Sequence, residues 1–139
     1  MTTLRRTSRR RRTSWASAVI APPEELAPTR PATGAISVMT LAELRAGVLL
    51  ARTARARETR RRRLDQIRAV FASLPVDEPV AERYAELLAQ ARTERRTTKA
   101  TDLLIIATAA ATSRTLYTFD EVQAGLASAA GLEVMRARG

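Results

Sequence analysis

Three carboxylates, Glu43, Asp102 and Asp120, stand beside stretches of this sequence that predict regular elements. Glu43 lies one helical turn after the apolar stretch 35–39, and Asp120 follows the strand-like stretch 115–118. Ligands of α/β proteins gather at the carboxyl ends of the strands, so we expect these acids at one edge of a sheet. Converging carboxylates repel one another unless a cation lies between them. A divalent metal there could activate a water and neutralise a phosphodiester oxygen.

The composition restricts which metal and which chemistry are possible. The chain has 139 residues, enough for one domain, and it contains no cysteine and no histidine. Disulfides, thiol nucleophiles, Ser-His relays and zinc sites built on Cys or His are therefore excluded. Any metal must be held by carboxylates and water, which are ligands that suit Mg²⁺ or Mn²⁺.

Each acid also has a purely structural interpretation. Glu43 stands at the third position of a capping box with Thr40. Asp102, or Thr101 beside it, could cap the helix that follows, and Asp120 could cap the next one. The expected convergence of all three favours a metal site over three separate caps.

Strand-like and helical stretches alternate along the chain. This alternation predicts an α/β fold with a parallel sheet and helices on its faces. The expected helices are 41–51, 52–74, one that begins at Asp77, the apolar stretch 103–111, and 122–130; the expected strands are 35–39, 74–76, 115–118 and 132–135. Val19 and Ile20 could form a further short strand at the front.

The formal net charge is +10, from 24 basic and 14 acidic residues. This balance favours a polyanionic partner such as RNA. The run Arg60 to Arg63 is the densest basic stretch that falls within an expected helix. Either the four arginines form a solvated helix face or they contact RNA phosphates.

Residues 1–33 differ from the rest of the chain, because they are rich in arginine and proline. We therefore divide the chain into this basic N-terminal segment, divergent or poorly ordered, and a domain over residues 34–139. The apolar stretch after the first arginines is about seven residues long, at the lower limit for an export signal. No stretch approaches the ~18 apolar residues of a membrane span. The sequence thus predicts a cytoplasmic protein that does not enter a membrane.

Four segments resemble, in order and spacing, the successive motifs of PIN-domain proteins of the VapC toxin type. They are Ala-Ile-Ser-Val-Met-Thr-Leu-Ala-Glu-Leu-Arg-Ala-Gly (35–47), Thr-Asp-Leu-Leu-Ile-Ile-Ala-Thr-Ala (101–109), Leu-Tyr-Thr-Phe-Asp (116–120) and Gly-Leu-Glu-Val (131–134). The resemblance covers about residues 34–136. It implies a PIN-like three-layer fold with a short parallel sheet flanked by helices.

The resemblance also implies a function. Members of this family are metal-dependent endoribonucleases, the toxins of type II toxin–antitoxin pairs, and usually form homodimers inhibited by a small antitoxin. By motif, Glu43, Asp102 and Asp120 would be the catalytic carboxylates that hold Mg²⁺ or Mn²⁺, and Thr118 the small polar residue of the last motif. Glu121 is a neighbouring acid that could assist.

The first motif of the family is missing. Its members open with a strand that ends in Asp-Thr-Ser, whereas the nearest stretches here are Arg6-Thr7-Ser8 and Arg12-Thr13-Ser14. The first strand and one metal ligand are therefore both in doubt. A catalytically inactive PIN-like module that binds an antitoxin or RNA is the alternative to an active ribonuclease. A basic nucleic-acid-binding protein unrelated to the family is a third hypothesis.

Overall fold

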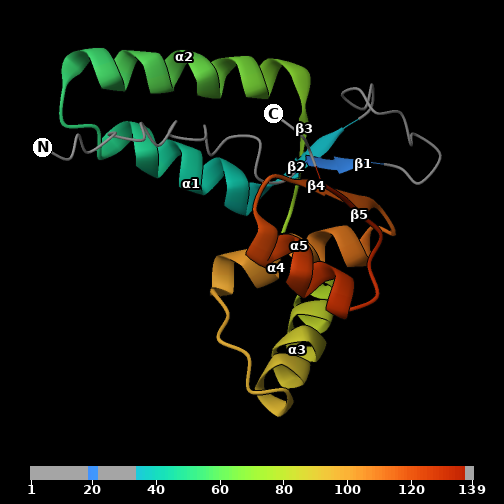
Figure 1. Cartoon of the computed structure of the whole chain (residues 1–139). Helices are drawn as coiled ribbons and strands as arrows, with labels where there is room; N and C mark the ends of the chain where they lie inside the picture. Colours follow the sequence, from blue (N-terminus) through green and yellow to red (C-terminus); the bar gives the residue numbers. More distant parts are fainter. Residues whose placement is uncertain (1–18, 22–33, 137–139) are drawn as a thin grey trace, which may run out of the picture.

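The computed structural model describes residues 19–21 and 34–136, which form five helices and five strands (Figure 1). In chain order they are β1 (Val19–Ala21), β2 (Ala35–Ser37), α1 (Val38–Leu49), α2 (Ala54–Val70), β3 (Ala72–Leu74), α3 (Glu78–Thr93), α4 (Ala100–Ala111), β4 (Thr115–Thr118), α5 (Glu121–Ala129) and β5 (Val134–Arg136). Of the predicted N-terminal segment, only β1 lies within the described residues. Both Arg-Thr-Ser stretches lie outside them.

The five strands form one sheet in the order β3-β2-β1-β4-β5. The predicted parallel pairing is confirmed for β2 with β3 and for β4 with β5. The central strand β1 instead runs antiparallel to both of its neighbours, with Ile20 opposite Ala35 on one side and Leu116 on the other. The suggested strand at Val19 and Ile20 therefore exists, and it makes the sheet mixed rather than wholly parallel.

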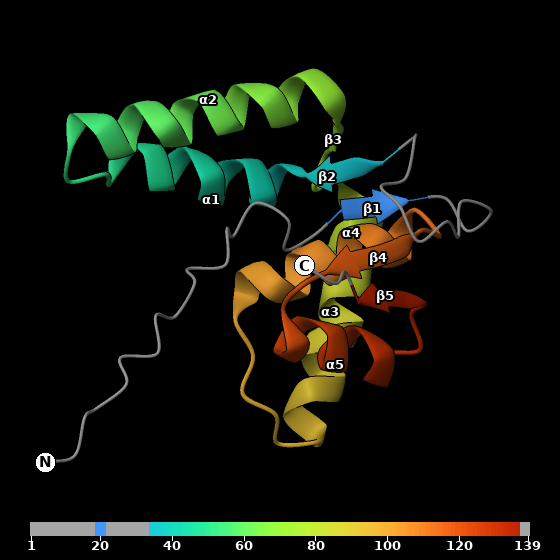
Figure 2. The same cartoon turned by 45° about the horizontal axis from the view of Figure 1, so that its top comes forward.

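Alternate residues of the strands face two different helical layers, as the two-residue period of a strand requires. Ile36 packs with Ile67 of α2 and with Phe71, the C-cap residue of that helix. Tyr117 packs against the same cluster. Leu116 faces the other way, into a core with Ile106 of α4. The predicted three-layer arrangement is confirmed, and Figure 2 shows α1 and α2 as a long hairpin on one side of the sheet.

The first helix begins earlier than predicted. Ser37 is its N-cap, with Oγ accepting a hydrogen bond from the Met39 N–H at 3.1 Å. Thr40 lies inside the first turn and is buried. The capping-box interpretation of Thr40 and Glu43 is therefore wrong, because β2 ends three residues before Thr40 and the adjacent serine takes the cap.

Two other boundaries differ from the predictions. The second helix ends at Val70 rather than Leu74, and β3 follows at once, ahead of the expected strand 74–76. Pro75 has no N–H to donate to a ladder, so the strand ends before it. Neither Thr101 nor Asp102 caps α4, because the helix already begins at Ala100, with Lys99 in the N-cap position.

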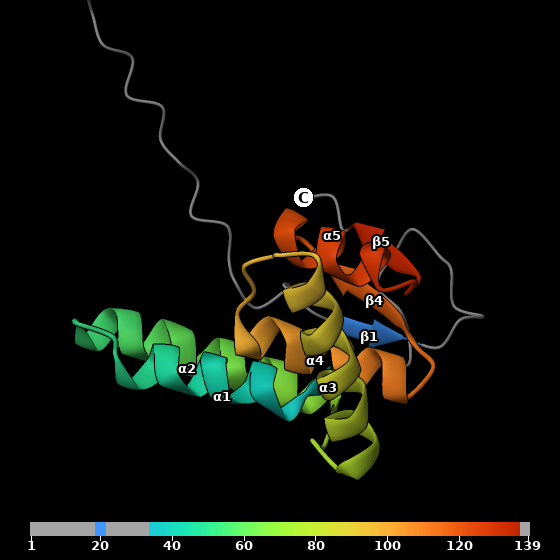
Figure 3. The ribbon, with the colours of Figure 1, turned by 90° about the horizontal axis from the view of Figure 1, so that it is seen from below.

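The most buried helix, α4, packs against α3, which crosses it in Figure 3. Its side chains at Leu103, Ile105, Ile106, Ala107, Thr108 and Ala109 are buried, which confirms the predicted core helix. Within the described ranges, no helix is long and apolar enough to cross a membrane.

Both α3 and α4 end in a Schellman turn with an unusual residue at its left-handed position. The Arg96 N–H donates to the Ala91 carbonyl and the Arg114 N–H to the Ala109 carbonyl. The residues before these donors, Arg95 and Ser113, have φ values of 54° and 52°. Glycine is the residue that adopts this conformation without steric cost, so the two positions carry matched local strain.

Candidate metal centre

Asp120 is fixed at the carboxyl end of β4 by two sets of hydrogen bonds. Its Oδ1 accepts from the N–H groups of Val122 and Gln123, at 2.9 and 3.1 Å, so the predicted capping of α5 is confirmed. Its own N–H donates to the buried Thr118 Oγ1 at 3.0 Å. Within the described residues Oδ2 accepts no hydrogen bond. The cap therefore leaves one carboxylate oxygen available to a ligand.

Thr118 lies beneath Asp120 and is itself held in place. Its hydroxyl donates to Oε1 of Gln123 at 2.8 Å, and both side chains are buried. The Thr118 hydroxyl donates to Gln123 and accepts from the Asp120 N–H, and these two bonds fix its orientation. Thr118 thus positions Asp120, which matches the supporting role expected for it.

Asp102 lies in the first turn of α4 and is half-buried. Burial raises the pKa of its carboxyl group, the negative charge of Asp120 raises it further, and the Lys99 ammonium opposes the shift. Since the two aspartates affect each other electrostatically, the fold brings them to one place although they are 18 residues apart. A carboxylate whose pKa is raised by a neighbouring carboxylate lies where a cation would be favourable.

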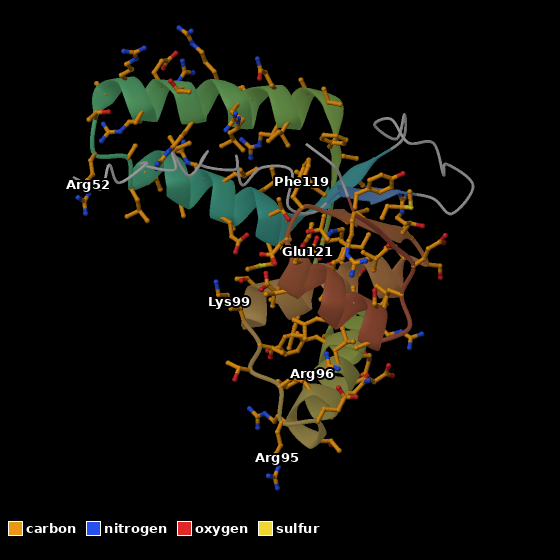
Figure 4. The ribbon with its side chains drawn as sticks, viewed as in Figure 1. Arg52, Arg95, Arg96, Lys99, Phe119 and Glu121 are labelled. Atoms are coloured by element: carbon orange, nitrogen blue, oxygen red, sulfur yellow. The ribbon has the colours of Figure 1, made fainter. Side chains whose placement is uncertain are left out.

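Three helices begin on the side of the sheet where the two acids lie. The first turns of α1, α4 and α5 lie on the same side of the molecule in Figures 1 and 2, at the carboxyl ends of β2 and β4. Figure 4 shows Lys99 and Glu121 at the starts of α4 and α5. The turns that carry Asp102 and Asp120 thus lie at this edge of the sheet, and the gathering of all three acids there stays a prediction.

Glu43 lies on α1 and is exposed. Among the residues that the structure describes, no group of three or more acidic side chains is placed so that it could hold a metal ion. The participation of Glu43 therefore stays a prediction. One turn before it, the buried Thr40 hydroxyl makes no hydrogen bond within the described part of the chain.

The donor set fits a hard divalent cation. Asp102 and Asp120 supply carboxylate oxygens, and the unpartnered Thr40 hydroxyl is a buried polar group of the kind that water or an ion satisfies. Mg²⁺ keeps several of its waters and needs only one or two protein carboxylates. Two carboxylates are therefore a donor set that suits such an ion chemically, with Glu43 as a further candidate.

The remaining sequence candidates are Glu121, the residue after Asp120, and the arginines of α2. Glu121 forms an exposed ion pair with Arg136 of β5 at 3.1 Å. The run Arg60 to Arg63 lies in the middle of α2, not at its start as predicted. Its contact with RNA stays a prediction.

Two residues near the acids were missed by the sequence analysis, Lys99 and Gln123. Gln123 is a polar residue at a core-facing position of α5, beside the buried Ala124 and Ala127, and that position was a usable signal. Lys99 has no such signal, because its place beside Asp102 depends on α4 starting at Ala100.

Comparison with known protein families identifies the family of this chain. The family model described as PIN domain matches residues 13–129. The chain is a PIN-domain protein. The match begins directly after Arg12, the arginine of the second Arg-Thr-Ser stretch. Family membership excludes the hypothesis of an unrelated basic protein.

Similar proteins are found among toxin–antitoxin systems. This PIN-domain chain is 39% identical to Ribonuclease VapC5 of Mycobacterium tuberculosis over 113 residues, 81% of each chain. The solved VapBC-5 structure from the same organism matches with a TM-score of 0.67 and 37% identity, over 73% of this chain and 80% of that one. The FitAcB structure from Neisseria gonorrhoeae matches with a TM-score of 0.64 and 37% identity, over 74% of each chain. Within its family the PIN-domain chain groups with the VapC and FitB toxins.

Proposed function

We propose that the chain is a metal-dependent endoribonuclease, the toxin of a type II toxin–antitoxin pair. The observation that carries this proposal is the placement of Asp102 and Asp120 in the first turn of α4 and at the N-cap of α5, at one sheet edge. Neither acid forms an ion pair among the described residues. The likeness to Ribonuclease VapC5 supports RNA as the substrate. The protein acts in the cytoplasm.

In this proposal, Asp102, Asp120 and Glu43 hold Mg²⁺ or Mn²⁺. Such an ion would supply an activated water and offset charge on a phosphodiester oxygen. The chain's own groups prepare the site: Thr118 and the α5 cap fix the Asp120 carboxylate. A carboxylate held by its cap loses little conformational freedom when it binds a ligand.

The proposed partners are a small cognate antitoxin and a second copy of the chain. The antitoxin is supported by the solved relatives, because the VapBC-5 and FitAcB structures come from toxin–antitoxin systems or their complexes. The homodimer rests on family resemblance.

The test is an RNA cleavage assay on the purified full chain without antitoxin. We expect cleavage of single-stranded RNA in Mn²⁺ or Mg²⁺ and none in EDTA, with more than about 100-fold loss in Asp102→Asn, since removal of a metal-binding group costs at least what loss of an outer-shell partner costs. Glu82→Gln removes an exposed carboxylate on α3 and should leave the activity unchanged. Cleavage that persists in EDTA or in Asp102→Asn would contradict the proposal.

A second candidate function has its own observation. The central strand β1 contains no acid and runs antiparallel to its neighbours, and the described residues hold no three-acid group. These features favour a catalytically inactive PIN-like module that binds an antitoxin or RNA. Tight co-purification with a small partner, with no cleavage even in excess Mn²⁺, would select this alternative.

A further inference from the structure

The arginines of α2 are engaged within the protein. Arg60 donates to the Gly47 carbonyl at 2.6 Å, and Arg61 and Arg62 both bind the Glu58 carboxylate, at 2.9 and 2.8 Å. Arg63 also interacts within the chain. Phosphate binding by this run would have to compete with these bonds. The α2 run is therefore a poor candidate for the main RNA contact.

The connection between α3 and α4, residues 94–99, has the opposite character. Arg95 and Lys99 are exposed, and neither side chain forms an ion pair or a hydrogen bond within the described part of the chain. The local acid, Glu94, is occupied by Arg96 at 2.7 Å. Two cations that form no ion pair with the described residues thus lie on this connection, and Figure 4 shows them at its two ends.

Lys99 lies beside the acid pair. It occupies the N-cap position of α4, but its side chain makes no capping hydrogen bond. Burial and the charge of Asp120 raise the pKa of Asp102, and the Lys99 ammonium works against that shift. The positive charge of Lys99 therefore acts on the Asp102 carboxylate. Without it, an RNA backbone approaching two carboxylates would meet only repulsion from them.

We propose that the connection 94–99 is the RNA-docking surface, with Lys99 binding a phosphate beside the acid pair and Arg95 binding a phosphate farther along the strand. The two cations are four positions apart in the sequence, and an extended chain of that length spans up to about 14 Å. That span lets one single strand contact both. This inference rests on the proposed function, because it assigns the substrate contact of the same site.

The chain offers an unusually clean variant for the test. Arg95→Gly removes one proposed phosphate contact and also relieves the left-handed strain at φ 54°. Its melting temperature should therefore be unchanged or higher, so lost binding cannot be attributed to unfolding. Ser113→Gly gives the same backbone relief, at φ 52°, at the opposite end of α4. It should leave RNA binding unchanged.

The experiment is fluorescence anisotropy of a labelled single-stranded RNA against the full chain, in EDTA, between about 50 and 200 mM salt. The slope of log K against log salt is negative, and each lost phosphate contact should reduce its magnitude by about 0.7. We expect this reduction, with several-fold weaker binding, in Lys99→Ala and in Arg95→Gly. Ser113→Gly and Arg62→Gln should match the unaltered chain.

The outcomes separate this inference from the proposed function. EDTA removes any metal, so loss of binding in the two variants supports the docking surface even if the chain cleaves nothing in Mn²⁺. The inference is overturned if Lys99→Ala and Arg95→Gly leave the magnitude of the slope unchanged, whether or not Arg62→Gln reduces it. It is also overturned if the unaltered chain does not bind single-stranded RNA.

Discussion

Asp120→Asn is expected to abolish metal-dependent RNA cleavage while leaving the free energy of unfolding nearly unchanged. Asp120 has two roles, one as the N-cap of α5 through Oδ1 and one as a proposed metal ligand through its charge. Asparagine keeps an oxygen acceptor for the Val122 and Gln123 N–H groups and is as good a cap as aspartate. Only the anionic charge is lost, and cleavage should fall by more than about 100-fold.

Asp120→Ala is the matched comparison, because it removes the cap as well as the charge. It should lose cleavage to the same degree and also lower the free energy of unfolding by about 1 kcal/mol. Urea unfolding in EDTA beside the cleavage assay measures both quantities. Full cleavage by Asp120→Asn would show that the charge is not needed. Equal destabilisation by Asn and Ala would show that the cap is not the structural role.

Asp102→Asn is expected to raise the stability of the metal-free protein at neutral pH. The folded-state pKa of Asp102 is raised by burial and by Asp120, above an unfolded value of about 3.9. A raised carboxyl pKa contributes stability that is full below pH ~4 and is lost as the pH rises through the folded pKa. At neutral pH the ionised Asp102 is therefore unfavourable, and an uncharged asparagine removes this penalty.

The gain should be below about 1 kcal/mol, since Asp102 is only half-buried and solvent screens its charge. It should shrink as the pH falls toward about 4, where Asp102 of the unaltered chain becomes protonated. Thermal unfolding in EDTA at both pH values measures it, with Glu82→Gln as an exposed control that gains nothing. A variant less stable than the unaltered chain at neutral pH would mean that the Asp102 carboxylate serves a structural bond instead.

The helices and most strands could be predicted because their patterns are strong. The all-apolar run of α4 and the Asp-Glu-Pro start of α3 each define their element locally. The direction of β1 could not be predicted, because three residues carry no directional signal. Ser37 and Thr40 are both good caps, and only the end of β2 selects the serine.

The candidate site was predicted in part for the same reasons. Asp120 follows a recognisable strand, so its place at the sheet edge could be derived from topology alone. Asp102 reaches that edge only because the buried face of α4 fixes the rotation of its first turn. The position of Lys99 depends on the exact start of α4, which no pattern in the sequence defines. Its role in RNA docking is therefore an inference from the structure alone.

The central claim, that Asp102 and Asp120 form one metal site, is tested most directly by thermal unfolding of the full chain in increasing Mg²⁺ or Mn²⁺. A ligand of the native state adds about 2.7 kcal/mol of stability at a hundredfold excess over its dissociation constant. We predict a melting temperature that rises with metal in the unaltered chain and in Glu82→Gln, and stays constant in Asp102→Asn and Asp120→Asn. The claim would be contradicted if the melting temperature of the unaltered chain did not change with either metal.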